Sequence, residues 1–320
     1  MLELVNLSNT NFDTETLFQG NTGALPRLLE DYHLDGIEML FCEPWNRIFH
    51  PADCIKGVHL RFWPSWMDFW RGNLPALLSE YGNREQIIAQ YGGLHPEDWL
   101  ALWRENIRQA VASGAEYFVF HVGQARRSEL YSRRFAYSDG EVIDAAAALI
   151  NDLADVIPDD WLLLFENLWW PGLTFQDAQA AARLLEKVHH RNSGFMLDTG
   201  HLMNTALDLT TEEDGIDYIL ETIKRLGSLR GAIKGIHLHQ SLSGPFVRQK
   251  KEAAVQPSMS GQEIMKYIIA VDQHHPFHSS RVQEIIELVK PEFLVHEFIQ
   301  YSYEDWVKKI ICQQHALGLH

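Results

Sequence analysis

Cysteine is scarce in this sequence, and long apolar runs are missing. The three cysteines, Cys42, Cys54 and Cys312, form no CxxC pair, so the sequence predicts neither a disulfide framework nor a cysteine zinc site. No stretch of about 18 apolar residues occurs, and the first residues lack a basic segment followed by an apolar one. We therefore expect a cytoplasmic protein with no signal peptide and no membrane span.

Basic residues are also in deficit. The chain of 320 residues has 27 Lys and Arg against 43 Asp and Glu, which gives a formal net charge of -16. Such a surface repels phosphate polymers and anionic lipid on average, so nucleic acid is a disfavoured partner. Bound divalent metals can still focus positive charge at one mouth of a barrel, so this partner is not excluded. The sequence leaves the oligomeric state open, a homo-oligomer included.

Eight short apolar runs recur between longer segments with helical spacing. The runs occupy residues 2–8, 36–41, 57–62, 117–122, 162–168, 194–199, 233–239 and 292–298. Apolar residues at i, i+3, i+4 and i+7 mark amphipathic helices at 97–113, 141–156, 176–190, 213–227 and 281–290. Buried parallel strands that alternate with helices predict an α/β fold, the (β/α)8 TIM barrel, as a single domain over residues 1–320.

The main alternative fold is an open, doubly wound sheet. It is disfavoured because no Gly-rich phosphate loop follows the first run, and because chemically capable residues follow many runs instead of one switch point. Two connections are longer than a minimal barrel needs. They are residues 63–95 after the third strand and residues 240–280 after the seventh. Loops after barrel strands lie on the catalytic face, so we expect these insertions to form the substrate pocket or a lid. The basic run RQKK at 248–251 is more typical of a solvated face than of a phosphate clamp.

Six of the predicted strands carry a metal-capable side chain at or near the carboxyl end. These side chains are His59, His121, Glu166, Asp198, His237 and Glu297. One such residue alone is more often a solvated side chain, but six equivalent positions converge on one mouth of a barrel. An apolar strand such as LLLFENL has little reason to bury Glu166 unless a cation compensates its desolvation. Mixed carboxylate and imidazole ligands indicate Mn or Zn first, with Co, Fe or Mg as alternatives.

Further candidates lie just beyond the strands. His201, Asp272 and His274 could ligate second and third metal ions or bind substrate. The substrate contacts that we expect are Trp63, Trp169, Trp170, His239 and Arg248. Indole rings near a barrel mouth suit a polyol, because the apolar faces of sugars stack on them, although each Trp has an equal reason to pack its loop against the barrel.

The motifs around these residues resemble those of a known superfamily. They are FHVG with His121, FENLWWPG with Glu166, LDTGH with Asp198 and His201, GIHLH with His237, DQHH with Asp272 and His274, and VHEF with Glu297. Their order and spacing are similar to those of xylose isomerase-like TIM barrels, from about the third strand to the last. That superfamily contains sugar isomerases, ketose 3-epimerases, inosose dehydratases, hydroxypyruvate isomerases and the endonuclease IV repair enzymes.

The resemblance implies one of two active sites. The isomerase and epimerase pattern places one divalent metal ion on Glu166, Asp198, His237 and Glu297, with His201 near the substrate. Glu166 and Glu297 would be the base and the acid that move a proton through a metal-chelated enediolate of a sugar or polyol. The endonuclease IV pattern uses the same four ligands and adds His59, His121, His201, Asp272 and His274, for a trinuclear zinc cluster that acts on abasic DNA.

The two patterns differ in their fit to this sequence. Departures from the nuclease are His239 and Gln240, where the nuclease has an Asn-Asp pair, the long segment 240–271 before Asp272, and the acidic net charge. We therefore expect a metal-dependent isomerase or epimerase of carbohydrate metabolism, with one ion per chain and a small sugar-derived substrate. The phosphoesterase with up to three ions is the alternative. A catalytically silent barrel is disfavoured, because it would have no need of the full ligand set.

Overall fold

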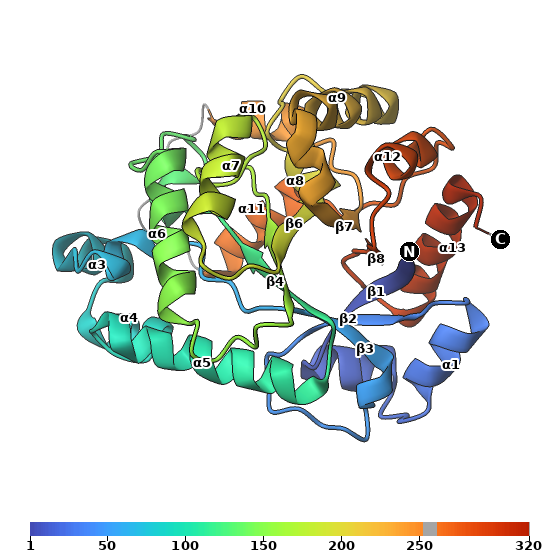
Figure 1. The fold of residues 1–320 in the computed structure, drawn as a ribbon, viewed down its shortest axis with the longest axis horizontal. Coiled ribbons are helices and arrows are strands. Elements are labelled where there is room, and N and C mark those ends of the chain that lie inside the picture. The colour runs from blue at the N-terminus through green and yellow to red at the C-terminus, as the bar shows by residue number, and fades with distance from the viewer. Residues whose placement is uncertain (252–260, 320) are drawn as a thin grey trace.

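The computed structural model describes residues 1–251 and 261–319, and its centre is a closed barrel of parallel strands (Figure 1). The strands pair in sequence order, and β1 closes the ring by pairing with β8. They are β1 Leu2–Ser8, β2 Gly36–Leu40, β3 Ile55–His59, β4 Tyr117–His121, β5 Leu162–Glu166, β6 Ser193–Asp198, β7 Ile233–Leu238 and β8 Phe293–His296. Each predicted run overlaps one strand, and the predicted (β/α)8 barrel is confirmed.

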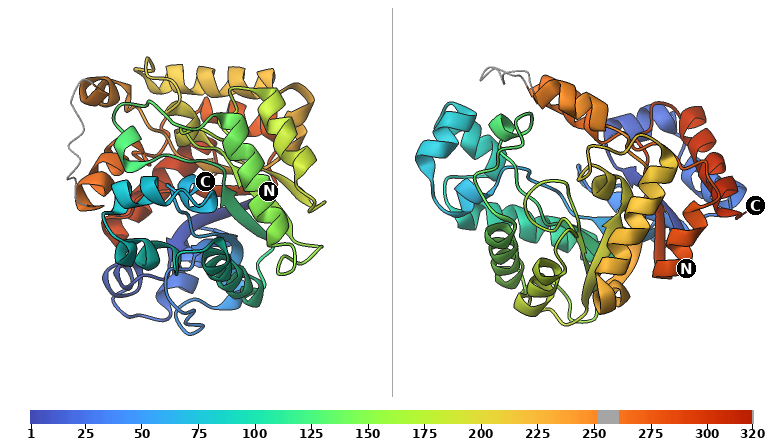
Figure 2. Two further views of the ribbon diagram at one scale, coloured as in Figure 1. Left: turned by 90° about the vertical axis from the view of Figure 1, so that its left-hand side faces the viewer. Right: turned by 90° about the horizontal axis from the view of Figure 1, so that it is seen from above.

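Helices form the outer layer around the strands (Figures 1 and 2). They include α1 Ala24–Asp31, α5 Pro96–Ser113, α6 Asp139–Asp152, α7 Ala178–Lys187, α9 Glu212–Arg225, α12 Val282–Val289 and α13 Tyr303–Leu317. Side-chain caps fix where helices begin, because Ser138 and Thr211 accept hydrogen bonds from backbone N–H groups in the first turns of α6 and α9. The apolar faces of these helices pack against the outer faces of the strands and form the main core.

Side chains fill the interior of the barrel. A buried cluster there contains Leu4, Tyr117, Val119, Leu164, Met196, Phe293 and Val295. Gly57 on β3 leaves room for the ring of Tyr117, because a Cβ atom at residue 57 would lie only 2.0 Å from the Cζ atom of that ring. The Tyr117 hydroxyl donates a hydrogen bond to Glu38 Oε2 at 2.7 Å. The interior therefore changes from apolar packing to polar groups toward the carboxyl ends of the strands.

Short helices occupy the segments after β3 and β7. Between β3 and α5 lie α2 Met67–Trp70, α3 Leu74–Tyr81 and α4 Arg84–Tyr91, and α3 reaches the edge of the molecule in Figure 1. After β7 come α10 Gly244–Lys251 and α11 Gly261–Val271. Residues 252–260 of the predicted insertion at 240–280 lie outside the described residues. The remaining elements are α8 Thr199–Met203 and the single turns η1 Phe12–Leu17, η2 Ala52–Cys54, η3 Arg127–Glu129 and η4 Gly227–Ala232.

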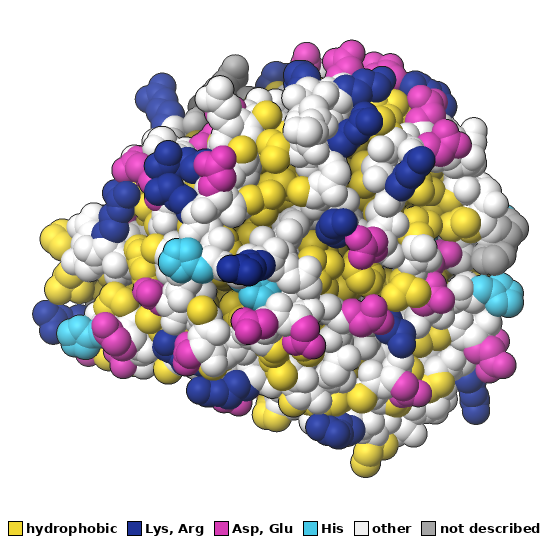
Figure 3. All heavy atoms as spheres, in the orientation of Figure 1, with side chains coloured by type: hydrophobic (Ala, Val, Ile, Leu, Met, Phe, Trp, Pro, Cys, Tyr) yellow, Lys and Arg dark blue, Asp and Glu magenta, His cyan; other side chains and the backbone are white. Residues whose placement is uncertain are grey.

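The molecular surface carries charges of both signs. On the face seen in Figure 3, Lys and Arg side chains are interspersed with Asp and Glu and do not gather into one broad basic patch. Among residues 1–251 and 261–319, no helix combines the length and the apolar character that a membrane crossing requires.

Candidate metal centre

The carboxyl ends of the strands bring the predicted primary ligands together. Glu166 ends β5, Asp198 ends β6, His237 lies near the end of β7, and Glu297 directly follows β8. Each offers one ligand atom, and the four atoms lie within 4.8 Å of one another. Glu166, Asp198 and His237 are fully buried, whereas the side chain of Glu297 is 14% exposed. The four residues therefore form one compact group with a single accessible member.

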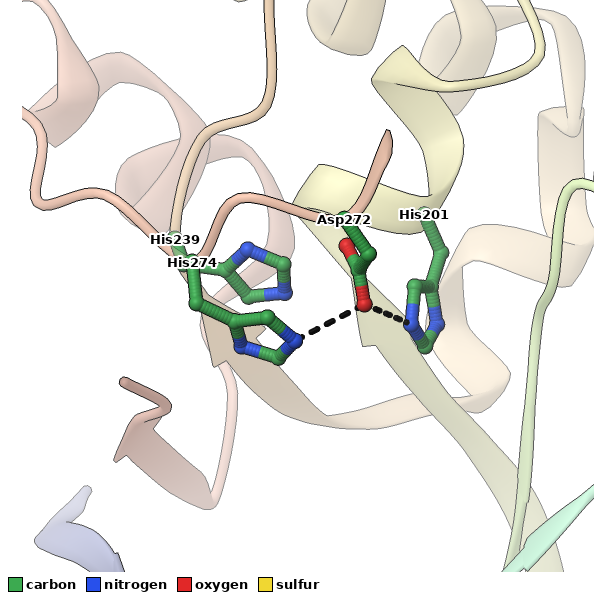
Figure 4. Close-up of side chains that lie close together, drawn as sticks. All are labelled: His201, His239, Asp272 and His274. Atoms are coloured by element: carbon green, nitrogen blue, oxygen red, sulfur yellow. Dashed lines mark hydrogen bonds and ion pairs between the residues drawn. The ribbon is translucent and has the colours of Figure 1, made fainter. Parts of the chain in front are cut away.

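Two further ligand groups adjoin this one, and a fourth set, Glu38, His59 and His237, overlaps these groups by sharing both of its histidines with them. The second group contains His59, His121 and Glu166, so Glu166 belongs to both. The third contains His201 on α8, His239 after β7, and Asp272 and His274 after α11, as Figure 4 shows. In that view Asp272 lies between His201 and His274, and the rings of His239 and His274 are stacked with centroids 3.9 Å apart. All predicted secondary ligands thus lie beside the primary group.

Glu166 connects the three groups through both of its oxygens. Oε1 lies 3.0 Å from His121 Nε2 and 3.0 Å from His201 Nδ1, while Oε2 lies 3.1 Å from His59 Nε2 and 3.5 Å from His237 Nδ1. Burial raises the pKa of this carboxyl group, but the positive charge that His121 and His237 can carry outweighs burial and holds the pKa well below its usual range. An ionised carboxylate in this position requires cations around it.

Backbone carbonyl groups fix the ring orientation of three histidines. Nδ1 of His59, His201 and His274 lies 2.9, 2.9 and 3.1 Å from the carbonyl oxygens of residues 60, 167 and 297, respectively. A carbonyl oxygen only accepts, so Nδ1 carries the proton in each ring. Nε2 then presents a lone pair at 2.8 to 3.1 Å from a carboxylate oxygen of Glu166 or Asp272. Two facing acceptors are stable only with a proton or a metal ion between them.

Several buried polar atoms at the centre make no well-directed hydrogen bond. They are both ring nitrogens of His121, Nδ1 of His237 and His239, Oε1 of Glu166 and Oε2 of Glu297. Buried polar atoms in folded proteins almost always make such bonds, so a cluster of atoms without them indicates a ligand-binding site. Neutral imidazole nitrogens and carboxylate oxygens are the donors that Mn, Zn, Co and Fe bind. The residues present therefore fit divalent metal ions.

The turn after β6 positions ligands of two groups. Asp198 is the N-cap of α8, and its Oδ1 accepts a hydrogen bond of 2.6 Å from the backbone N–H of His201 in the first turn of that helix. Asn167 holds the same turn by accepting from the Asp198 N–H and donating to the Asp198 carbonyl. Gly200 is required there, because a Cβ atom would lie 2.0 Å from Cε1 of His239. The sequence LDTGH thus fixes the backbone as well as supplying two candidate ligands.

One functional residue escaped the sequence analysis. Glu38 on β2 is 2% exposed, and its carboxylate lies 2.9 Å from Nε2 of His237. A carboxylate in this position accepts from Nε2–H, so the lone pair of His237 lies on Nδ1, which points toward the primary group. Burial raises the pKa of Glu38, but His237 outweighs it, and the pKa falls below its usual value. The only available signal was a lone carboxylate within the apolar run GIEMLF.

The sequence also matches a known family. Residues 26–306 match the sequence profile of a family described as the xylose isomerase-like TIM barrel. The chain belongs to this family. The sequence motifs resembled those of xylose isomerase-like barrels. The match to this family confirms the prediction.

Solved structures share the fold of this xylose isomerase-like barrel at low sequence identity. Endonuclease IV from Thermus thermophilus is 14% identical with a TM-score of 0.54, and the alignment covers 100% of both chains. The IolI protein with a bound zinc atom is 14% identical with a TM-score of 0.52 over 99% of this chain and 96% of that one. L-ribulose 3-epimerase is 12% identical with a TM-score of 0.52 over 98% and 94%. No curated protein sequence gives a significant match.

A cavity of about 520 Å³ opens above the ligands of this xylose isomerase-like barrel. Its floor includes His59, His121, His201, Asp272, His274 and Glu297. Its walls come from the loops after β1, β2, β3 and β8, and Phe62 lies against His121 with ring centroids 4.5 Å apart. The volume suits a substrate of small-molecule size.

None of the predicted substrate contacts is among the described residues that line this cavity, although two of them lie next to residues that do. Trp169 lies beside His201, with ring centroids 5.0 Å apart, and Trp170 stacks near Phe62. His239 lies in the third ligand group, with Nε2 2.9 Å from Asp198 Oδ2, so it is also a candidate metal ligand, and its contact with substrate stays a prediction.

Trp63 and Arg248 do not line the cavity, contrary to expectation. Trp63 is 2% exposed and packs against Trp99 and Trp103 of α5, because burial of a large indole between loop and helix is favourable. Arg248 is exposed and donates a hydrogen bond to the carbonyl oxygen of Leu207.

Proposed function

We propose that this protein is a metal-dependent hydrolase of phosphate esters with up to three divalent ions at its mouth. One observation carries the proposal: Glu166 belongs to two adjacent ligand groups, and His201 connects it to the third. The first ion would be held by Glu166, Asp198, His237 and Glu297, the second by His59, His121 and Glu166, and the third by His201, His239, Asp272 and His274. A single ion would leave the last two groups without a cation, and the burial of their carboxylates without ions is costly.

Divalent ions held by these residues would polarise a phosphoryl oxygen and acidify a water molecule, as multinuclear sites do in phosphatases and nucleases. The chain contributes the positioning. Both oxygens of Glu166 face imidazole groups, so this carboxylate would help to hold the ions and is not free to act as a general base. Phe62 and Trp169 pack against His121 and His201 and keep bulk water away from those imidazoles.

The charge of the centre depends on how many ions it holds. Glu166, Asp198, Asp272 and Glu297 are the four carboxylates of the three groups. One divalent ion leaves this set net negative, which suits a neutral polyol, whereas three ions make it net positive, which suits a phosphate. The acidic surface of the protein as a whole, with a formal net charge of -16, is therefore compatible with a phosphate ester at the mouth.

A small phosphate ester fits the surroundings better than duplex DNA does. Arg61 is the only Lys or Arg among the residues that line the cavity of about 520 Å³. The face in Figure 3 shows no broad basic tract. A protein that grips a DNA backbone needs several such cations, because phosphate contacts supply most of its affinity.

A second candidate is the isomerase or epimerase of a sugar or polyol with a single ion. A specific arrangement favours it, because two carboxylate oxygens lie close to Nδ1 of His237. Oε2 of Glu297 is 3.4 Å from this nitrogen, and Oε2 of Glu166 is 3.5 Å from it. Two carboxylates at one ion position could remove a proton from one side of a carbon and return it from the other. The structural relatives named D-tagatose 3-epimerase-like protein and L-ribulose 3-epimerase are consistent with this candidate.

The variant Asp272→Asn separates the two candidates. Asp272 belongs to the third ligand group and not to the primary one. If the protein is the proposed hydrolase, the variant loses hydrolysis of 4-nitrophenyl phosphate and bis(4-nitrophenyl) phosphate by about a hundredfold or more, which corresponds to about 2.7 kcal/mol in the barrier. A single-ion epimerase would instead interconvert ketoses in both the native protein and the variant. Asp144→Asn is the control, because Asp144 pairs with Arg183 on the outer helices.

A further inference from the structure

One guanidinium group at the mouth cavity has no anionic partner. Arg61 follows β3 two residues after His59, is exposed, and lines the cavity together with His59, His121 and Glu297. Within the described residues it forms no ion pair. An Arg that is left unpaired beside a substrate cavity is a natural partner for an anionic group.

The structure holds Arg61 in place from two sides. Its backbone N–H donates to Oδ1 of Asn106 at 2.9 Å, and its guanidinium carbon lies 5.0 Å from the centroid of the Trp63 ring. Trp63 is itself buried and donates from Nε1 to the carbonyl oxygen of Gln90 at 2.9 Å. The guanidinium group therefore stacks on a fixed ring, which lowers the entropy lost when it binds a ligand.

One acidic side chain of the cavity is already engaged. Asp13 lines the same cavity, but its Oδ2 accepts hydrogen bonds from the backbone N–H and the hydroxyl of Ser8. Burial raises the pKa of the neighbouring Cys42 thiol, and the positive charge of Arg61 opposes that rise.

We propose that Arg61 recognises a second anionic group of the substrate, a phosphate or a carboxylate, while the first phosphate occupies the metal centre. The inference rests on the proposed function for the first phosphate, because that function places it over the ligand groups. A planar guanidinium group binds either anion through two parallel hydrogen bonds. The substrate class is then a small phosphate ester with a second negative charge, such as a sugar bisphosphate or a phosphorylated acid.

Calorimetric binding to the metal-loaded, full-length protein tests this inference without requiring turnover. The probes are two matched pairs, glycerol 3-phosphate with 3-phosphoglycerate, and fructose 6-phosphate with fructose 1,6-bisphosphate. We expect the native protein to bind the second member of at least one pair about tenfold or more tightly, the amount typical of a charge-assisted hydrogen bond. A preference for 3-phosphoglycerate alone identifies the second anion as a carboxylate. A preference for fructose 1,6-bisphosphate alone identifies it as a phosphate.

Two arginine variants make the test specific. Arg61→Gln should remove the preference, whereas Arg47→Gln should retain it, because Arg47 stacks over Trp45 at 4.3 Å but does not line the cavity. Equal affinity of the native protein within both pairs, or an unchanged preference in Arg61→Gln, overturns the inference. If the Arg61-dependent preference is found but no phosphate ester is hydrolysed, the proposed hydrolase function fails and the recognition role of Arg61 stands.

Discussion

Nε2 of His237 lies 3.1 Å from Oε2 of Glu38, and this contact directs the other ring nitrogen of His237 toward the primary ligand group. Glu38→Gln replaces the carboxylate with an amide, which accepts a weaker hydrogen bond. We expect the affinity for Zn²⁺ to fall by about 10 to 100-fold, as loss of a supporting carboxylate usually causes. Competition with a chromophoric chelator measures this affinity.

Tyr117→Phe is the matched control for that experiment. It removes the hydroxyl that donates to Glu38 at 2.7 Å but leaves the carboxylate beside His237. We expect a smaller loss of affinity than in Glu38→Gln. An affinity in Glu38→Gln equal to that of the native protein would contradict the positioning role.

Gly200→Ala should disturb the third ligand group. The added Cβ atom would lie 2.0 Å from Cε1 of His239, so either the ring or the start of α8 has to move. We expect the variant to fold and to bind about one metal ion fewer per chain, as elemental analysis would show. Gly140→Ala is the control, because no atom lies within 4 Å of a Cβ there. Equal metal content in the two variants would refute this prediction.

Asp68→Asn should lower stability at neutral pH. Asp68 is 2% exposed and accepts from Nε and Nη2 of Arg126 at 2.6 and 2.8 Å and from the Tyr137 hydroxyl at 2.7 Å. The variant leaves Arg126 without its counter-ion, and we expect a loss of about 2 kcal/mol in the free energy of unfolding. Urea denaturation at pH 7 measures the loss, with Asp144→Asn as an exposed control that should lose less than about 1 kcal/mol.

The same carboxylate should contribute to stability in a pH-dependent way. Burial raises the pKa of Asp68, but the hydrogen bonds from Arg126 and Tyr137 outweigh burial and hold the pKa below its usual value. A group with a depressed pKa stabilises the fold above its unfolded pKa of about 3.9 and loses this contribution as the pH falls through the folded pKa. The native protein should therefore lose more stability than Asp68→Asn between about pH 5 and pH 2. Parallel pH profiles would contradict this account.

The barrel and its ligand ring could be predicted from the sequence, because both follow from periodicity. Apolar runs that alternate with amphipathic segments indicate strands and helices, and the carboxyl ends of barrel strands meet at one mouth. Glu166 and Asp198 could therefore be expected near each other although 31 residues lie between them in sequence.

Features that depend on side-chain direction could not be predicted in this way. Trp63 follows a strand end, yet its indole packs against Trp103 of α5 and is not among the residues that line the substrate cavity. Glu38 lies within a strand, and only the closed barrel shows that it faces His237 on the opposite side of the ring. The protonated nitrogens of His59 and His274 depend on backbone carbonyl groups whose positions no residue pattern encodes.

The central claim is that the mouth holds more than one ion, and the most direct test is the metal content per chain. Protein purified without chelators or a His tag would be loaded with Zn²⁺ or Mn²⁺, freed of excess ions and analysed by elemental mass spectrometry, together with Asp272→Asn and Asp198→Asn. The account predicts about three ions in the native protein, one per ligand group, about one fewer in Asp272→Asn, and a larger loss in Asp198→Asn. One ion that is retained in Asp272→Asn and lost in Asp198→Asn would contradict the multinuclear centre and favour the epimerase, and no bound ion would contradict the metalloenzyme altogether.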